Sequence, residues 1–306
     1  MNVSFYIDNQ NHKGVDYSNP EYGNPGVGGT QYMFWTIAYY LQTFYNDIEV
    51  NVIAPYIKTM PKSLNSYKAK SILDSVKIAK EVGSDILVLR GPTNNKKLFT
   101  FINLYKIKVV FWSHNFENWK FAELVSKCNY VERNICVGKE QLDRLRDHEI
   151  FNKSTYIYNA LDFKLYDPYS DGEKNNKIVG YMGSLTKRKG FHKLAKNWKD
   201  IVSHVPEAKL YVLGGGDLYG KQWEMGSRNL TNQSYEKLLM KYLTNNSGEI
   251  LPSVEFKGVV SGKEKLELLK RIRVGVANPT GVGETFCIVA TEYEAVGTPV
   301  VAIKKN

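Results

Sequence analysis

The sequence has little cysteine and no long apolar run. Its three cysteines, Cys128, Cys136 and Cys287, are odd in number and lack the spacing of metal ligands, which predicts reduced thiols in a cytosolic compartment. No apolar run approaches the roughly 18 to 20 residues that cross a bilayer. The start MNVSFYIDNQ lacks the basic and apolar regions of a secretory signal. We therefore expect a soluble, cytoplasmic protein.

Acidic residues are also outnumbered, so the chain carries a formal net charge of +10. This balance favours an anionic partner, which could be nucleic acid, an acidic membrane surface or a phosphorylated small molecule. The basic residues are spread through most segments, so a generally basic surface is an equally good interpretation. Zinc-finger spacing and RNA-binding signatures are missing, and we expect no nucleic-acid partner.

Short runs rich in Val and Ile alternate with longer segments of helical spacing. In the first half we expect strands at 3–7, 48–54, 85–90, 108–112 and 133–138, with helical segments at 29–45 and 66–83. The polar stretch 162–176 interrupts the pattern. It restarts with expected strands at 177–183, 208–216, 254–258, 273–278 and 299–303. The alternation predicts an α/β protein with two doubly wound parallel-sheet domains, residues 1–168 and 169–306.

Ligands bind parallel sheets at the carboxyl ends of the strands, and two unusual segments of the first half lie after expected strands. The loop GNPGVGGTQ (23–31) would let the backbone approach a ligand at Gly28 and Gly29, but it fits neither the Walker nor the dinucleotide pattern. A flexible surface loop is an equal alternative. In WSHN (112–115), His114 is placed to meet a substrate, or to be satisfied by its own loop.

The segment YMGSLTKRKGFHKL (181–194) has the strongest anion-binding pattern. A strand is expected to end at Gly183, and Lys187, Arg188 and Lys189 precede an expected helix. Cationic side chains and the amides of a helix start both attract phosphate. We favour a phosphate site over a solvated basic turn.

Two carboxylates stand in GVGETFCIVATEYEAVGTPVVA (281–302). A helix is expected from about Phe286 to Val296, which puts Glu284 at its mouth and Glu292 about 12 Å further along the axis. The apolar residues between them predict a largely buried helix. Carboxylate oxygens accept hydrogen bonds from hydroxyls, and a bidentate grip on vicinal hydroxyls is possible. A nucleotide diphosphate sugar has hydroxyls at both ends and a diphosphate between them.

Glu284, Glu292 and EAVGTPVV together resemble the E-x7-E signature of retaining glycosyltransferases of family 4, which have the GT-B fold of two facing Rossmann-like domains. The similarity extends over nearly the whole chain: GVGGT resembles the family's glycine loop, and NALD (159–162), GSLTKRKG (183–190) and YVLGGG (211–216) resemble later family motifs. Several motifs in the family's order make the resemblance specific.

The resemblance implies a role for each matching residue. His114, Lys189 and Glu284 would be catalytic: His114 would reach the transferred sugar, Lys189 the diphosphate and Glu284 the donor sugar. Glu292 would hold the ribose. The implied donor-binding set is Gly28, Gly29, Gly183, Ser184, Arg188, Lys189, Phe286, Cys287, Ile288 and Glu292.

The implied activity is retaining transfer of a hexose-type sugar from a nucleotide diphosphate sugar to a glycan or lipid-linked acceptor, in cell-surface polysaccharide synthesis. No Asp-x-Asp pair appears, so we expect no metal and no cofactor. The basic surface suggests peripheral contact with the inner face of an anionic membrane.

This sequence departs from the family pattern in two places. Ser184 stands where many members have arginine, so Lys189, with Lys187 or Arg188, must supply the phosphate-binding charge. The sequence stops at VVAIKKN, where family members continue, so the carboxyl-terminal domain looks truncated. The alternative function is therefore a truncated, catalytically impaired homologue that acts as a donor-binding or partner subunit. The polar insertion 217–251 is expected to be one helix with flanking loops.

Overall fold

The computed structural model describes residues 1–167, 175–216 and 224–303. The chain divides into two compact units. The first unit comprises Met1–Pro20 and Gly29–Ala160, and the second comprises Glu21–Gly28 and Leu161–Asn306.

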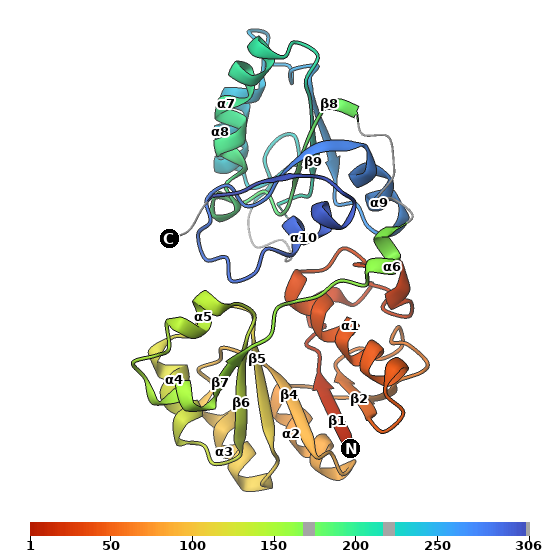
Figure 1. Ribbon diagram of the computed structural model, residues 1–306, viewed down its shortest axis with the longest axis vertical. Coiled ribbons are helices and arrows are strands. Elements are labelled where there is room, and N and C mark those ends of the chain that lie inside the picture. The colour runs from red at the N-terminus through yellow and green to blue at the C-terminus, as the bar shows by residue number, and fades with distance from the viewer. Residues whose placement is uncertain (168–174, 217–223, 304–306) are drawn as a thin grey trace. The chain divides into compact units, whose positions relative to one another are not determined.

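The first unit contains a seven-stranded parallel sheet in the order β3-β2-β1-β4-β5-β6-β7 (Figure 1). Its strands are β1 (Asn2–Tyr6), β2 (Glu49–Ala54), β3 (Asn65–Lys68), β4 (Ile86–Gly91), β5 (Val109–Ser113), β6 (Val131–Cys136) and β7 (Ser154–Tyr156). Its α-helices are α1 (Gly29–Phe44), α2 (Ile72–Glu81), α3 (Lys96–Tyr105), α4 (Trp119–Lys127) and α5 (Lys139–Asp143).

Helices pack on the first sheet because its strands are apolar on both faces. On one face, Phe111 of β5 lies against Phe99 of α3 and Phe121 of α4, with ring centroids 5.5 and 5.2 Å apart. On α1, Phe34 meets Phe5 of β1 edge to face at 6.4 Å. Asparagine or serine side chains cap α2, α3 and α4 by accepting a hydrogen bond from the first-turn backbone.

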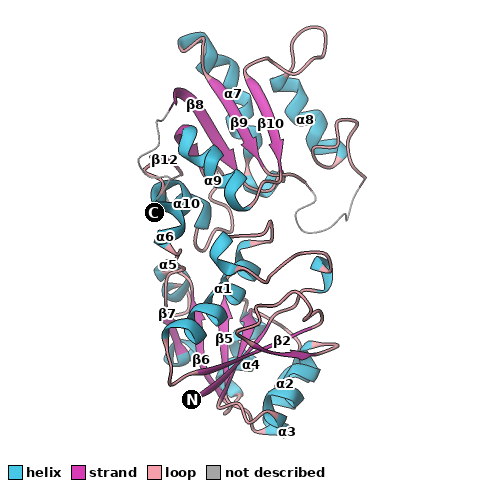
Figure 2. Cartoon of the chain, turned by 90° about the vertical axis from the view of Figure 1, so that its right-hand side faces the viewer, coloured by secondary structure: helices cyan, strands magenta, loops and turns pink. Residues whose placement is uncertain are grey.

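The second unit contains a five-stranded parallel sheet in the order β10-β9-β8-β11-β12 (Figure 2). Its strands are β8 (Asn175–Met182), β9 (Lys209–Leu213), β10 (Val254–Gly258), β11 (Ile272–Val276) and β12 (Val300–Val301). Its α-helices are α6 (Phe163–Tyr166), α7 (Phe191–His204), α8 (Gln233–Leu243), α9 (Gly262–Arg271) and α10 (Ile288–Ala295). Two separate apolar cores, one with α7 and α8 and the other with α6, α9 and α10, fill the two faces of this sheet.

The expected α/β class with two parallel sheets is confirmed. Every expected strand is present, although several ends differ by a few residues and β12 keeps only two. Two short edge strands, β3 and β7, are additional. The segment 66–83 was wrongly expected to be helical throughout, because β3 occupies its start and α2 begins only at Ile72. Short polar edge strands carry little periodic signal, which explains both misses.

Three further expectations change in the second unit. The last helix begins at Ile288 instead of Phe286, and only Glu292 and Tyr293 within it are buried, so the expected largely buried helix is wrong. The stretch 162–176 contains α6 and the start of β8, and 168–174 lie outside the described residues. In the insertion, α8 is present with two bridges beside it, Met225–Asn232 and Thr244–Ile250, while 217–223 are not described.

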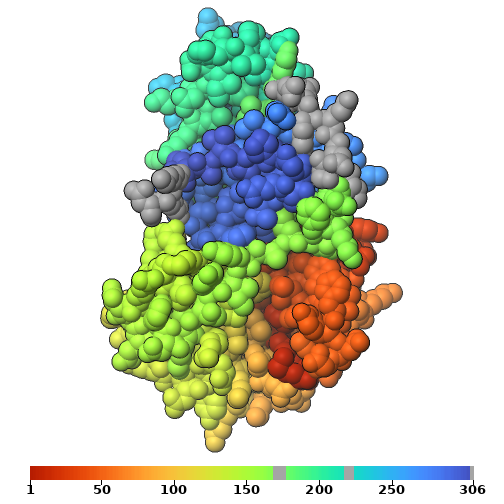
Figure 3. All heavy atoms as spheres, viewed as in Figure 1, coloured from red at the N-terminus to blue at the C-terminus, as the bar shows by residue number. Residues whose placement is uncertain are grey.

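None of the helices in the described ranges combines the length and apolar character needed to cross a membrane. The carboxyl-terminal segment, drawn in blue in Figure 3, contributes to the surface of the second unit on the face shown.

Candidate functional site

The carboxyl edge of the second sheet is built on two glycines. Gly183 follows β8 with φ +149° and Gly214 follows β9 with φ +138°, a region that favours glycine. A Cβ on Gly214 would overlap the carbonyl of Gly183, and the Gly183 amide donates to the Leu213 carbonyl at 2.9 Å. The close approach of the two strand ends therefore requires glycine at position 214. The basic turn follows Gly183 a few residues later in the chain.

The three basic residues form a separate 3-10 turn, Lys187–Lys189, before α7 begins at Phe191. The Thr186 hydroxyl accepts a hydrogen bond from the Lys189 amide, and Thr280 donates its hydroxyl to the Arg188 carbonyl. The expectation that the three cations precede a helix is confirmed, and they form a turn of their own before it. The Thr280 hydrogen bond ties this turn to the loop after β11, which brings two distant segments together.

Lys189 and Glu284 meet at this edge of the sheet. Lys189 Nζ lies 2.6 Å from Glu284 Oε2, and Asn278 Nδ2 donates to the same oxygen at 2.6 Å. Asn278, with φ +38°, closely follows β11. Both charged side chains are mostly shielded, with 21% and 17% of their surface exposed. The structure thus joins two of the predicted residues and adds Asn278, which the sequence did not single out.

The other predicted donor-binding residues of the second unit lie close to Lys189 or Glu284 in the sequence. Ser184 is buried, and its carbonyl accepts a hydrogen bond from the Tyr181 hydroxyl at 3.4 Å. Phe286 and Cys287 lead into α10, whose first residue is Ile288. Burial raises the pKa of the Cys287 thiol, and the charge of Glu284 adds to the effect. The thiol is therefore neutral at pH 7.

Glu292 does not join Glu284 but belongs to a buried cluster of its own. Its Oε1 accepts hydrogen bonds from Lys265 Nζ at 2.6 Å and from the Tyr166 hydroxyl at 2.8 Å. Sequence reasoning missed both partners. Lys265 looks like the other lysines of α9, and the two partners stand 27 and 126 residues from Glu292. No local spacing could have found them.

In the first unit, His114 directly follows β5 and is only 8% exposed. Its ring packs against Trp112 and Phe34, with centroids 4.6 and 5.9 Å away. Burial, together with the nearby charge of Arg90, lowers the pKa of His114 to about 4. The imidazole is therefore neutral at pH 7, and it can donate or accept a hydrogen bond without bringing charge.

The glycine loop is closed by its own asparagine. Asn24 Oδ1 accepts from the amides of Gly26 and Val27, at 3.0 and 2.9 Å, and its Nδ2 donates to the Val27 carbonyl. Gly28 is buried and Gly29 begins α1. Local hydrogen bonds of Asn24 therefore define the turn of this loop.

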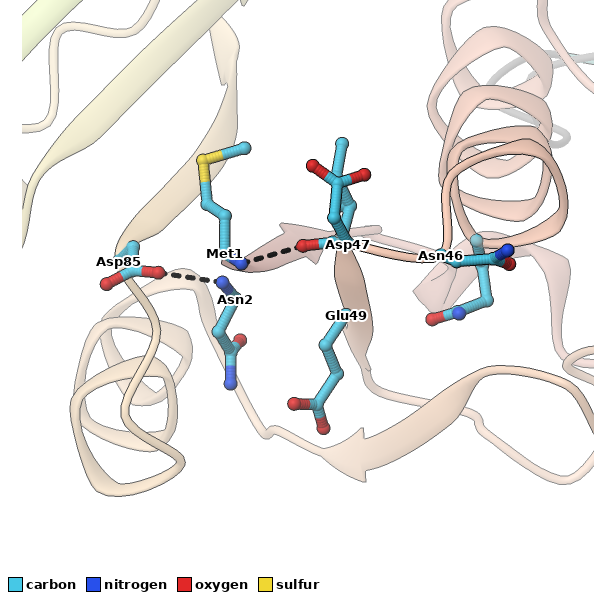
Figure 4. A pocket seen from close by; sticks show the side chains of 8 residues that line it. Met1, Asn2, Asn46, Asp47, Glu49 and Asp85 are labelled. Atoms are coloured by element: carbon cyan, nitrogen blue, oxygen red, sulfur yellow. Dashed lines mark hydrogen bonds between the residues drawn. The ribbon is translucent and has the colours of Figure 1, made fainter.

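The first unit has one pocket at the carboxyl ends of its strands and another at their amino ends. One, of about 350 Å³, lies beside the carboxyl ends of β1 and β4, and Asp8, Gln31 and Arg90 contribute to its lining. The other, of about 470 Å³, lies at the amino ends (Figure 4). There Asp85 accepts a hydrogen bond from the Asn2 amide, so this carboxylate holds a strand end in place.

Within residues 1–167, 175–216 and 224–303, no three His, Cys, Asp or Glu side chains gather as the ligands of an ion would.

Residues 167–306 match the family model described as "Glycosyl transferases group 1". A curated relative, an uncharacterized glycosyltransferase of Methanocaldococcus jannaschii, is 23% identical over 276 residues, which cover 74% of this chain and 68% of the relative.

Two solved structures share the fold. The Anabaena protein HepE, solved in complex with UDP, has a TM-score of 0.65 and 16% identity and aligns over 100% of this chain and 81% of its own. A glycosyltransferase from Rickettsia africae has a TM-score of 0.68 and 14% identity, over 99% and 79%. With the two parallel sheets, these findings establish the GT-B fold and support a glycosyltransferase whose residues 167–306 match group 1.

Proposed function

We propose that the chain is a retaining glycosyltransferase that moves a hexose-type sugar from a nucleotide diphosphate sugar to a hydroxyl of a glycan or glycolipid acceptor, in cell-surface polysaccharide synthesis. The observation that carries the proposal is the meeting of Lys189 and Glu284 at the carboxyl edge of the second sheet, with Nζ and Oε2 2.6 Å apart. A cation for the diphosphate and a carboxylate for sugar hydroxyls thus stand side by side.

Donor binding would change the partners of this pair. A diphosphate brings an additional anionic partner for the Lys189 ammonium. Glu284 would stay in place because Asn278 Nδ2 also holds it, and it would accept a hydrogen bond from a hydroxyl of the sugar. We assign Lys187 and Arg188, in the same turn, to the outer side of the diphosphate. Gly183 and Ser184, and the backbone of Phe286 to Ile288, complete the proposed donor site.

In the proposed reaction, the acceptor hydroxyl attacks the anomeric carbon as the bond from that carbon to the diphosphate oxygen breaks. The bonding electrons leave with that oxygen, which then takes the proton of the attacking hydroxyl. Attack and departure on the same face retain the anomeric configuration. Lys189 would stabilise the charge that develops on the leaving group, and binding would supply the orientation.

His114 would contribute to this reaction as a neutral group. Because burial keeps the pKa of its imidazole near 4, we assign it a hydrogen bond to a sugar hydroxyl and no role as a cation. Gly28 and Gly29 keep the role of a close backbone approach to the substrates.

We infer that transfer needs no metal ion and no cofactor, since the sequence has no Asp-x-Asp pair and lysine is available to neutralise the diphosphate. Addition of EDTA should leave the transfer rate unchanged. A loss of activity that Mg²⁺ or Mn²⁺ restores would contradict this part of the proposal.

A cytoplasmic enzyme that sits on the inner face of an anionic membrane fits the net charge of +10. Sedimentation with vesicles of anionic lipid should exceed sedimentation with neutral vesicles, and 0.5 M salt should abolish the difference. Equal recovery with both vesicle types would remove the membrane from the proposal.

The activity itself is tested by incubating the full chain with UDP-, GDP- and ADP-hexoses and a lipid-linked or free sugar acceptor. NMR of the product would report the anomeric configuration. Lys189→Met should lower kcat/KM by about 100-fold or more. Lys196→Met, an exposed lysine on α7, is the matched control and should behave as wild type.

Four outcomes separate the alternatives. Transfer with retention supports the proposal, while transfer with inversion contradicts its mechanism. Donor binding without transfer would favour the catalytically impaired, donor-binding subunit. If no nucleotide diphosphate binds, the proposal is wrong.

A further inference from the structure

Three helices of the second unit place one side chain each around the Glu292 carboxylate. Tyr166 comes from α6, Lys265 from α9 and Glu292 from α10. All three are buried, with 0%, 5% and 5% of their surface exposed. Charged side chains are rarely this buried without a partner, and here the lysine supplies it.

Both hydrogen bonds to Glu292 go to the same oxygen. Lys265 Nζ and the Tyr166 hydroxyl donate to Oε1, at 2.6 and 2.8 Å. A carboxylate oxygen has two lone-pair sites, so these two donors saturate Oε1. Oε2 accepts no hydrogen bond from any residue that the structure describes. One acceptor atom of a nearly buried carboxylate is thus left for another donor.

We propose that Lys265 and Tyr166 are positioning residues that fix the Glu292 carboxylate and leave Oε2 to accept a hydrogen bond from one hydroxyl of the donor's ribose. The inference rests on the proposed function, because it takes the ligand to be a nucleotide. A bidentate grip on two vicinal hydroxyls was possible from the sequence, whereas this arrangement leaves one oxygen of Glu292 for one hydroxyl. One ribose hydroxyl then carries most of the recognition, and its neighbour carries little.

The positioning role follows from what each partner prevents. Lys265 balances the carboxylate charge where water cannot, so Glu292 stays at this place in the fold. Tyr166 fills the second site on Oε1, which stops the carboxylate from turning to share both oxygens with Lys265. Without the Tyr166 hydroxyl, the carboxylate can rotate and Oε2 loses its fixed direction.

A purely structural ion pair makes a different prediction. If the cluster only stabilises the fold, loss of the Tyr166 hydroxyl lowers the melting temperature and reduces affinity for a nucleotide and its deoxy analogue alike. If the cluster positions Oε2, loss of the Tyr166 hydroxyl makes the affinities for the nucleotide and its deoxy analogue more nearly equal. The ratio of affinities therefore separates the two roles, and a change in stability does not.

The experiment titrates the full chain by calorimetry with UDP, GDP and ADP, and then with the 2′-deoxy and 3′-deoxy forms of whichever binds most tightly. Wild type should lose about tenfold in affinity with one deoxy form and little with the other. Tyr166→Phe should reduce that tenfold ratio to about threefold or less.

Tyr293→Phe is the matched control. Tyr293 neighbours Glu292 in sequence and is fully buried, but its hydroxyl has no hydrogen-bond partner among the residues that the structure describes. The control should keep the wild-type ratio. An unchanged ratio in Tyr166→Phe, or an equal loss with both deoxy forms in wild type, would overturn the inference and leave the proposed function standing. If wild type binds none of the three diphosphates, the proposed function fails and the inference fails with it.

Discussion

The two units differ in the surroundings of their buried ionisable groups. In the first unit, burial lowers the pKa of His114 and raises the pKa of Glu117, so burial favours the uncharged form of each. In the second unit, the shielded carboxylates stand opposite lysines: Glu284 with Lys189 and Glu292 with Lys265, each 2.6 Å apart.

The difference shows what a buried ionisable group needs in order to act as a charge. Burial alone favours the uncharged form, whereas a close opposite charge favours the ionised one. In the proposed function, the edge of the second sheet binds a diphosphate, and the second unit has charged side chains there in pairs. In the first unit, the neutral imidazole of His114 is a hydrogen-bonding group that suits an uncharged sugar in the proposed function.

The largest effect on stability is expected from Lys265→Met. It leaves the Glu292 carboxylate buried without its cation, and the free energy of unfolding in urea should fall by about 3 to 5 kcal/mol. The double variant Lys265→Met with Glu292→Leu replaces both charges with apolar groups and should recover most of the loss. If the double variant is as unstable as the single one, the loss comes from packing and not from an unpaired charge.

The next largest effect is expected from His114, which should make the free energy of unfolding depend on pH. An unfolded imidazole has a pKa near 6.5 and the folded one about 4, so between these values the unfolded state binds more protons. The neutral imidazole therefore contributes about 3 kcal/mol to the free energy of unfolding above pH 6.5, and this contribution is lost as the pH falls to 4.

Unfolding free energies of wild type and His114→Asn, measured from pH 7 to pH 4, should therefore converge as the pH falls. His204→Asn, at an exposed histidine of α7, is the control and should run parallel to wild type. Parallel curves for His114→Asn would mean that the imidazole is not kept neutral by the fold.

Glu117 should give a smaller effect of the opposite sign. Burial raises the pKa of its carboxyl above 4.5, although Oε1 accepts hydrogen bonds from Asn134, Gln141 and Cys136 that favour the charged form. The folded state then binds more protons, and stability from this group is lost as pH rises above that value. Glu117→Gln should gain stability relative to wild type from pH 5 to pH 8. A difference that is constant with pH would contradict the assignment.

The smallest effect is expected from the unpartnered hydroxyl of Tyr293. The side chain is fully buried against Gly180 and Gly275, where any Cβ would overlap it. Tyr293→Phe removes a polar atom that has no hydrogen-bond partner in the described part of the chain, so the free energy of unfolding in urea should rise by up to about 1 kcal/mol. Tyr166→Phe, which loses a hydrogen bond to a carboxylate, should instead be destabilised. Destabilisation of equal size in both variants would show that the hydroxyl of Tyr293 has a partner.

Sequence reasoning reached the parts of this molecule that local patterns encode. Runs of Val and Ile predicted the buried strands. The glycine after β8 and the basic turn were predictable because they follow that strand directly in the sequence. It could not reach contacts between distant segments. Asn278 became visible as a partner of Glu284 only when the loop after β11 met the basic turn, and Lys265 and Tyr166 only when three helices converged on Glu292. The sequence predicted separate positions for the two glutamates, but it did not reveal that each one pairs with a lysine.

The most direct test of the account is a crystal structure of the full chain with the nucleoside diphosphate that binds most tightly. The account predicts a phosphate oxygen within hydrogen-bond distance of Lys189 Nζ, and Glu292 Oε2 within that distance of one ribose hydroxyl while Oε1 keeps Lys265 and Tyr166. A nucleotide bound elsewhere, with Lys189 in contact only with Glu284 and no ribose hydroxyl at Glu292, would contradict it.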